Sequence, residues 1–287
     1  MRTLLLGVLG LSGFLLAVVL LGRRRWAART RVLHTRLDQL RSGEPQVVTS
    51  ADDLPAPVAR YLRSALAGLD SPIDLIHLGH EGTFNIDPVA ERWRPFTSDQ
   101  VITTRPPGFV WDGRVRVLPG LAIHVHDAYV GGEGHLHASV LGWLTVARPP
   151  ASSGLAEGEL MRFLAEAVWY PSLLLPGCPV RWEAIDDASA RATLHDGDVS
   201  ASLVFRFGPD GLVAGVEAAA RDRTVGTEQV PTPWQGRFWD YRRLERILIP
   251  LEGEVSWLLP TGPLPYWRGR ICGYTVSTDV PSVSPTT

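Results

Sequence analysis

The chain has 287 residues, of which 45% are hydrophobic and 20% charged, a composition typical of a folded protein with one large domain or two small ones. The formal net charge of −2 excludes the global positive field expected of a nucleic-acid-binding protein. All 28 basic residues are arginines, which excludes a lysine Schiff base and a P-loop lysine.

The first feature in chain order is an uncharged, mostly apolar segment at residues 4–22. As a helix it is about 28 Å long, close to the roughly 30 Å hydrocarbon core of a bilayer. Arginines follow it directly, and no small-residue cleavage site of a secretory signal is present. We therefore predict an uncleaved transmembrane anchor at residues 1–22.

Arginines are distributed unevenly around this segment. Arg2 precedes it, whereas seven arginines follow: Arg23, Arg24, Arg25, Arg29, Arg31, Arg36 and Arg41. The positive-inside rule predicts a single-pass protein of the cell membrane whose C-terminal domain lies in the cytoplasm. Within a juxtamembrane helix and linker at 23–53, Trp26, Leu33, Leu37 and Leu40 form a narrow stripe, typical of a solvated stalk or of a short dimerising coil.

Residues 54–277 read as one β-rich domain, opened by a helix in which Val58, Tyr61, Leu62 and Ala65 recur at helical spacing after Pro55. From residue 73 onward the hydrophobic period is two. Turn signals such as Gly208-Pro209-Asp210-Gly211 separate twelve expected strands, at about 74–84, 96–104, 109–117, 121–130, 135–146, 180–185, 189–195, 199–207, 212–222, 234–241, 246–258 and 266–276. We expect residues 278–287 to be a disordered tail.

One helix interrupts the strands, within residues 158–170. Leu160, Phe163, Leu164, Ala167 and Val168 form its apolar face, and Glu159, Arg162 and Glu166 are expected on the opposite, solvent-facing side. The short connections predict antiparallel neighbours. We therefore predict a mainly β (α+β) fold, in which helices cover a large curved antiparallel sheet or half-barrel.

Several segments resemble an uncharacterised bacterial family of membrane-anchored proteins, over about residues 55–275. The resemblance is carried by RPPGFVWDGRVRV at 105–117, ELMRFLAEAVWYPSLLLP at 159–176, PVARYL at 57–62, Trp182, Ile249-Pro250 and Pro265-Tyr266-Trp267. This family has no known activity, so the resemblance implies no catalytic residue. The order of strands and helix is also similar to the LolA-like half-barrel. That likeness implies a lipid-carrying fold that acts outside the cytoplasm, in contrast to the orientation the arginines predict.

Two histidine pairs, His124 with His126 and His135 with His137, flank a glycine-rich segment. With a four-residue loop at 131–134, all four histidines share one face of a hairpin and His126 lies diagonal to His137. A solvated strand face is the simpler interpretation, and a metal site at His126 and His137 is the alternative. Asp127 projects to the apolar side, where we expect it to pair with an arginine such as Arg114 or Arg116.

The chain contains none of the short motifs G-x-S-x-G, H-E-x-x-H, G-x-G-x-x-G or Walker A. Glu159 and Glu166, with Arg162 between them, are interpreted as a solvent-side ion network, with an acid–base pair as the alternative. Cys178 and Cys272 lack metal or redox spacing, and we expect two separate thiols, with one disulfide as the alternative. No cofactor is expected.

The ten tryptophans are the outlier of the composition. Five of them lie on or beside the predicted helix and the strands that it should cover: Trp111, Trp169, Trp182, Trp257 and Trp267. These five serve either as core or as the lining of an apolar cavity, in which Arg268 or Arg270 meets the head group of the ligand. The predicted function is a membrane protein that binds a lipid-like ligand and no nucleic acid. The alternatives are a hydrolase-type enzyme with a polar site at Glu166 and His126, and a non-catalytic subunit of an envelope complex. The predicted ligand-binding residues are Trp111, Trp169, Trp182, Trp257, Trp267 and Arg268.

Overall fold

The computed structural model describes residues 2–41, 53–69, 73–87 and 91–277, without the side chains of residues 2–12, 14 and 15. The predicted linker at 42–52 and the predicted tail at 278–287 lie outside the described residues, as do most side chains of the predicted anchor. None of the described helices is both long enough and apolar enough to cross a membrane.

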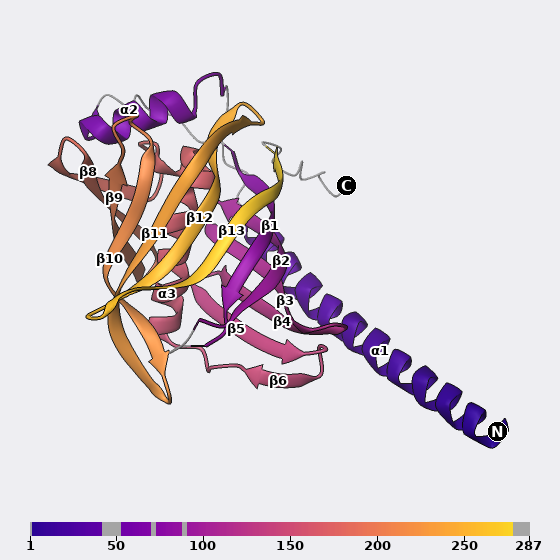
Figure 1. Ribbon diagram of the computed structural model, residues 1–287. Coiled ribbons are helices and arrows are strands. Elements are labelled where there is room, and N and C mark those ends of the chain that lie inside the picture. Colours follow the sequence, from indigo (N-terminus) through magenta and orange to yellow (C-terminus); the bar gives the residue numbers. More distant parts are fainter. Residues whose placement is uncertain (1, 42–52, 70–72, 88–90, 278–287) are drawn as a thin grey trace, which may run out of the picture.

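A single sheet of thirteen strands organises the fold, and it curves into a half-barrel (Figure 1). All strand pairs are antiparallel, and the spatial order is β6-β5-β4-β3-β2-β1-β13-β12-β11-β10-β9-β8-β7. The mainly β, curved antiparallel architecture predicted from the sequence is thus confirmed. The strands are β1 (Leu75–Asn85), β2 (Trp93–Thr104), β3 (Pro107–Leu118), β4 (Leu121–Val130), β5 (Glu133–Val140), β6 (Leu144–Ala147), β7 (Val180–Asp186), β8 (Ser189–Asp196), β9 (Val199–Phe207), β10 (Val213–Val225), β11 (Glu228–Leu244), β12 (Ile247–Leu259) and β13 (Gly262–Ser277).

The strand order follows from two meanders that meet in the middle of the sheet. The first runs outward from β1 to β6, and the second returns from β7 to β13, which pairs with β1. The chain must therefore cross from one edge of the sheet to the other between β6 and β7. The crossing segment is helical and fills the concave side.

Five of the tight turns lie at one end of the sheet, since successive antiparallel strands reverse there. We call this the α1 end; its tight turns are at residues 119–120, 141–143, 197–198, 226–227 and 260–261. The predicted strand at 135–146 is interrupted at this end, because Leu141 and Gly142 adopt positive φ of 52° and 75° and turn β5 into β6.

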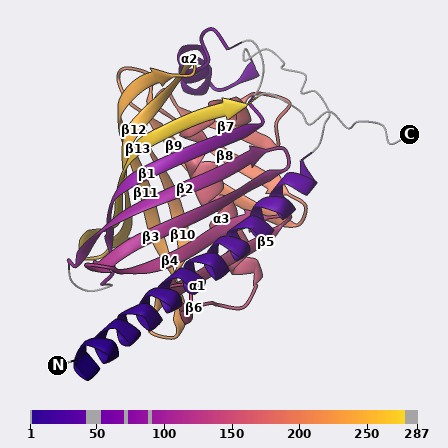
Figure 2. The same cartoon turned by 90° about the vertical axis from the view of Figure 1, so that its right-hand side faces the viewer.

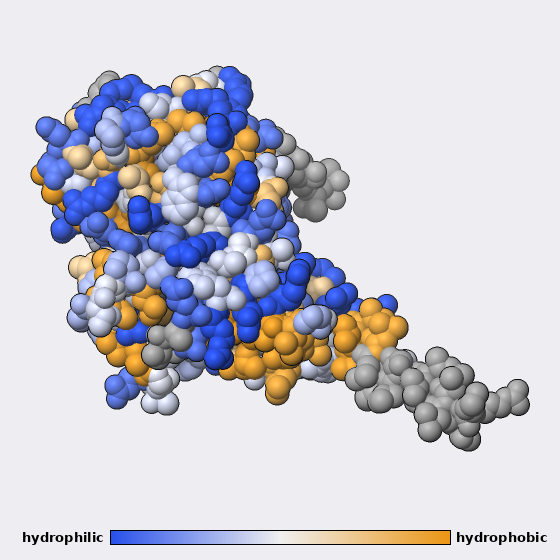
Figure 3. Space-filling model, viewed as in Figure 1, coloured by the Kyte–Doolittle hydropathy of each residue, from blue (hydrophilic) through white to orange (hydrophobic). Residues whose placement is uncertain are grey.

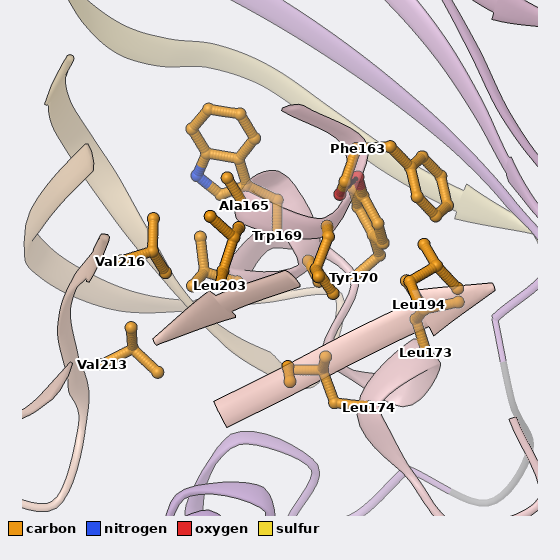
Figure 4. Close-up of a cluster of buried hydrophobic side chains, with 14 of the residues drawn as sticks. Phe163, Ala165, Trp169, Tyr170, Leu173, Leu174, Leu194, Leu203, Val213 and Val216 are labelled. Carbon is orange, nitrogen blue, oxygen red and sulfur yellow. Dashed lines mark hydrogen bonds between the residues drawn. The ribbon is translucent and has the colours of Figure 1, made fainter. Parts of the chain in front are cut away.

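The crossing segment consists of α3 (Ser153–Ala165) and two 3₁₀ helices, η2 (Glu166–Trp169) and η3 (Pro171–Leu174). The helix begins five residues before the predicted start because the Ser152 hydroxyl caps it, accepting from the Leu155 backbone N–H at 3.2 Å. Around the segment, Phe163, Tyr170 and Leu174 belong to one buried cluster with residues of β8, β9 and β10 (Figure 4). The Trp169 ring lies beside His80 of β1 and Trp267 of β13. Because α3 contacts both β5 and β9, it joins the two wings of the half-barrel.

The helix α2 (Ala56–Ala65) covers the end of the half-barrel opposite the α1 end and contacts β8, β12 and η3 (Figure 1). Its buried face carries Val58, Tyr61, Leu62 and Ala65, as the spacing predicts. Pro55 occupies the N-cap position without a side-chain hydrogen bond.

The long helix α1 (Arg2–Leu40) lies across the outer, convex face of the sheet and projects beyond it (Figure 2). Leu33 and Leu37 pack against Val110, Ala128 and Val130 of β3 and β4. The predicted stalk and the predicted dimerising coil are both wrong for this part of the helix. Its apolar stripe is narrow because it covers a strip of sheet only a few strands wide.

Candidate functional site

A buried ionic cluster lies between α3 and the concave face of the sheet, centred on Arg162. The Arg162 guanidinium donates to Asp127 Oδ2 of β4 at 2.5 Å and to Glu166 Oε1 of η2 at 2.7 Å. Gln100 of β2 closes the ring by donating to Glu166 Oε2 at 2.6 Å. The guanidinium also lies over the rings of Phe109 and Trp111, at 4.8 and 5.2 Å from their centroids.

The position of these charges corrects two predictions. Glu159, Arg162 and Glu166 face the sheet instead of solvent, because α3 lies inside the half-barrel and contacts strands on several sides. Asp127 pairs with Arg162, whereas Arg114 pairs with Asp99 at 3.3 Å. Burial alone would lower the pKa of Arg162, but Glu166 and Asp127 outweigh burial and raise it. The guanidinium is therefore held firmly in its charged form.

Glu159 completes the cluster as a buried carboxyl group whose surroundings favour its protonated form. Burial raises its pKa well above the ordinary value, Asp127 raises it further, and Arg221 and Arg162 act in the opposite direction. Glu159 Oε2 and Asp127 Oδ1 have no other partner among the described residues, so a proton on Glu159 is shared with Asp127. Arg221 contacts this carboxyl group at 3.9 Å.

His80 of β1 is buried beside this cluster and is neutral. Its Nδ1 lies 3.3 Å from Ser98 Oγ, and its ring centroid lies 5.1 Å from that of Trp169 and 6.0 Å from that of Trp267. Burial, with a contribution from the Arg162 charge, lowers the pKa of His80 to about 3. A solvent-exposed histidine would have offered a proton relay near pH 7, but this one is locked as an uncharged core residue.

An aromatic rim, which we define as Phe84, Trp257 and Tyr266, lies on the concave face at the α1 end. Trp257 stacks on Tyr266 with ring centroids 5.5 Å apart, and Phe84 meets Tyr266 at 6.0 Å. All three side chains are half-buried, unlike the fully enclosed rings around η2. The polar edge of the rim is Arg221, which lies over Trp234 at 5.4 Å and 3.5 Å from the Tyr266 hydroxyl.

The structure places the six predicted ligand residues in three regions. Trp111, Trp169, Trp257 and Trp267 face the concave interior, and Trp169 lies 6.5 Å from Trp267. Trp182 lies at the far edge of the sheet, where its indole donates to the Leu174 carbonyl at 3.2 Å. Arg268 lies on the outer face, pairing with Glu254 at 2.7 Å and covering Trp93 at 4.5 Å. The structure therefore does not bring Arg268 together with the five predicted tryptophans.

Sequence reasoning missed Phe84, Trp234, Tyr266 and Arg221. Tyr266 is adjacent to the predicted Trp267, yet both reach the interior because β13 has a bulge opposite Val255 and Ser256. A second bulge, between Ala218 and Arg221 of β10, places Arg221. The signal available in the sequence was the pairing of Trp234 with Trp257, which requires the strand register.

The helix α1 covers the strand face that carries His124 and His126. The simpler interpretation, a solvated strand face, is therefore wrong. Trp26 stacks on His126 at 3.9 Å and 13°, and its indole donates to Asp112 Oδ1 at 2.9 Å. Thr30 bridges Asp112 and His126, at 3.0 and 2.8 Å. Burial lowers the pKa of His126 to about 4, although Asp112 opposes this. Within the described residues no group of three or more ligating side chains is placed to hold a metal.

The hairpin register also differs from the expectation. His126 lies directly opposite His137, because Gly131 and Gly132 alone form the turn, with φ of 61° and 81°. Two consecutive positive-φ residues make the tight turn that suits strand twist. The predicted enzymatic site at Glu166 and His126 is wrong, since Glu166 lies inside the half-barrel and His126 lies on the outer face under α1. Cys178 and Cys272 are not joined by a disulfide.

The family model of DUF6920, described as a family of unknown function, matches residues 52–274. No curated protein matches the sequence. A LolA superfamily protein from Nitrosomonas europaea is 12% identical with a TM-score of 0.34, and the match covers 82% of this chain and 96% of that chain. A DUF1329 family protein from Desulfovibrio piger is 11% identical with a TM-score of 0.41, covering 79% and 95%.

The predicted resemblance to an uncharacterised family is confirmed by the family match, and a LolA superfamily protein is among the similar structures. Neither structure is similar enough to assign a ligand or a reactive residue here. A functional assignment therefore depends on the geometry of this chain.

Replacing Arg162 by methionine should lower the free energy of unfolding by about 3–5 kcal/mol, because Asp127 and Glu166 would remain buried without their counter-charge. The matched control is Arg206→Met, which removes an exposed pair with Glu217 and should cost at most about 1 kcal/mol. Urea unfolding of the full chains in detergent measures both. Equal losses in the two variants would contradict the proposed importance of the cluster.

The neutral state of His80 predicts acid sensitivity. The folded pKa is about 3 against 6.5 in the unfolded chain, so between these values only the unfolded chain binds the proton. Stability is then lost as the pH falls below about 6.5, by up to about 1.4 kcal/mol per pH unit.

Between about pH 7 and pH 4.5, His80→Gln should therefore lose about 2 kcal/mol less than the wild type, as measured by urea unfolding. His195→Gln, at an exposed histidine of β8, is the control and should lose as much as the wild type. A His80→Gln profile parallel to that of the wild type would show that His80 does not titrate as proposed.

Proposed function

Because the chain belongs to DUF6920, a family whose function is unknown, we propose a function from the geometry: it is a single-pass membrane protein that holds a lipid-like ligand on the aromatic rim. The observation that carries the proposal is the half-buried stack of Trp257 on Tyr266 beside the cation of Arg221. Apolar surface with a few convergent polar groups is the usual composition of a ligand site.

Aromatic exposure at the rim supports this proposal. Rings that serve only as core are enclosed, as Trp169 is at 3% exposure, whereas Phe84, Trp257 and Tyr266 are half-buried residues. Covering that surface with an acyl chain is favourable by about 25 cal/mol per Å² of apolar area. The rim therefore offers a reason to bind a lipophile that the enclosed interior does not.

A head group has a cation available at the rim. Burial raises the pKa of Glu159 and favours its protonated form, which compensates the charge of Arg221 less than a carboxylate would. The Arg221 side chain is 14% exposed. A phosphate or carboxylate on the ligand can form a charge-assisted hydrogen bond with it. Arg221 thus takes the role for which the sequence suggested Arg268.

The membrane attachment is part of the proposal. The apolar segment at 4–22 continues without a break into the docked part of α1, so a helix in the bilayer would be joined rigidly to the sheet. The arginines after the segment favour a cytoplasmic domain. The aromatic rim lies at the α1 end, which would face the bilayer surface and shorten the path of a lipid to the rim.

A second candidate is a non-catalytic subunit of an envelope complex. It is favoured by the dense packing of α3, η2 and η3, which leaves the rim as the accessible part of the concave face. The two candidates differ in whether a lipophile occupies the rim.

Trp257→Ala should weaken binding of a pyrene-labelled fatty acid about tenfold, through the loss of a stacked ring worth about 1.4 kcal/mol. The control is Trp239→Ala, which removes an exposed tryptophan on the outer face of the neighbouring strand β11. Fluorescence titration of the detergent-extracted chain measures the affinity, and native mass spectrometry detects a co-purifying lipid. Undiminished binding in Trp257→Ala, with no lipid in the native spectrum, would favour the complex subunit.

The exposed thiol of Cys272 is a natural reporter of orientation. In a Cys178→Ser background, a membrane-impermeant maleimide applied at about pH 8 should label Cys272 only after the cells are permeabilised, because the domain is proposed to be cytoplasmic. Cys178→Ser/Cys272→Ser provides the background signal. Labelling of intact spheroplasts would place the domain on the other side of the membrane.

A further inference from the structure

A hollow of about 420 Å³ lies on the outer face, between α1 and the β3–β4 hairpin. Its volume is in the range of small-molecule sites. The helix approaches closely here because Gly22 and Gly142 face each other; a Cβ on Gly22 would clash with the Leu141 carbonyl oxygen. The residues that line the hollow are Val19, Arg23, Trp26, Ala27, Asp112, Arg114, Gly120, Ala122, His124 and Leu141.

The charges in this hollow suit an anion. Two arginines, Arg23 and Arg114, belong to its lining, and Arg114 also pairs with the exposed carboxylate of Asp99 at 3.3 Å. The carboxylate of Asp112 is turned to the helix, where it accepts from the Trp26 indole at 2.9 Å and the Thr30 hydroxyl at 3.0 Å. His124 is buried, and its Nδ1 has no hydrogen-bond partner among the described residues.

The surface around the hollow is apolar and basic. Leu118, Trp143, Leu144 and Val146 are between 42% and 66% exposed. The Trp143 indole donates to the Val18 carbonyl of α1 at 2.8 Å, and Arg25 covers the ring at 5.1 Å. Hydrophobic residues accordingly gather where α1 leaves the domain (Figure 3).

Further arginines crowd this corner. Burial lowers the pKa of Arg29, and the charges of Arg25 and Arg148 lower it further. Tryptophan beside arginines is typical of the bilayer interface, and each arginine near an anionic leaflet contributes about 1 kcal/mol. Exposed leucines beside uncompensated cations therefore fit a lipid surface better than they fit water.

We propose that this hollow binds the phosphate-bearing head group of an anionic phospholipid, while Leu118, Trp143 and Leu144 dip into the bilayer surface. Arg23 and Arg114 hold the phosphate, and His124 lies within the same lining. The inference depends on the membrane attachment in the proposed function. It is independent of the aromatic rim, which lies on the other face of the sheet.

The experiment is native mass spectrometry of the full chain in detergent, with equal amounts of phosphatidylglycerol and phosphatidylcholine. The wild type should form a single adduct with a preference for phosphatidylglycerol. Arg23→Gln/Arg114→Gln should lower that preference about tenfold, since two charges near the phosphate are lost. Inorganic phosphate, added alone, is the second probe and should compete weakly.

The matched control is Arg24→Gln/Arg116→Gln, which removes the same charge from exposed neighbours outside the lining. This control should keep the preference, and an equal loss would reveal diffuse attraction and overturn the site. A wild type without preference overturns it too. Tight binding of inorganic phosphate without a lipid preference would identify free phosphate as the ligand and overturn the lipid assignment.

Failure of this site and failure of the proposed function remain distinguishable. Trp257→Ala should retain the phosphatidylglycerol adduct, because the rim and the hollow lie on opposite faces of the sheet. If the chain is released from membranes by carbonate, the attachment itself is refuted, whatever the head-group preference.

Discussion

A buried guanidinium group needs negatively charged partners. The partners of Arg162 therefore determine the position of α3. Asp127 comes from β4, Glu166 from η2, and Gln100 from β2, so the helix is tied to the wing of the sheet formed by β1–β6. Its apolar residues contact the other wing. Removing either set of contacts would leave the two edges of the half-barrel without a common support.

This arrangement explains why the concave interior is more a core than a cavity. The crossing from β6 to β7 must span the sheet, and a helix followed by two 3₁₀ turns occupies the space that a ligand would need. At the α1 end, Phe84, Trp257 and Tyr266 are only half-buried. The rim and the outer hollow are therefore the two places at which we propose ligands.

The period-two pattern predicted almost every strand, because alternation of side chains is a local property of the chain. The exception, β5 with β6, depends on positive φ at Leu141, which side-chain polarity does not report. The faces of α3 were assigned wrongly for a related reason. An amphipathic pattern assumes that a helix has one buried side and one solvent-facing side. The charge of Arg162 is instead compensated inside the protein by Asp127, and burial favours the protonated form of Glu159. Arg221 was missed because a β-bulge changes which face a residue meets.

The outer face shows how a helix can turn a polar strand surface into an interface. His126 and Asp112 would be solvated on an isolated sheet, yet Trp26 and Thr30 of α1 satisfy Asp112 and stack on the imidazole. Burial lowers the pKa of His126, so this imidazole adds no positive charge beside the arginines of α1. Because α1 is one continuous helix, any force on its N-terminal half reaches β3 and β4 directly. The aromatic rim lies at the same end of that sheet, and the orientation of the helix therefore determines where the rim points.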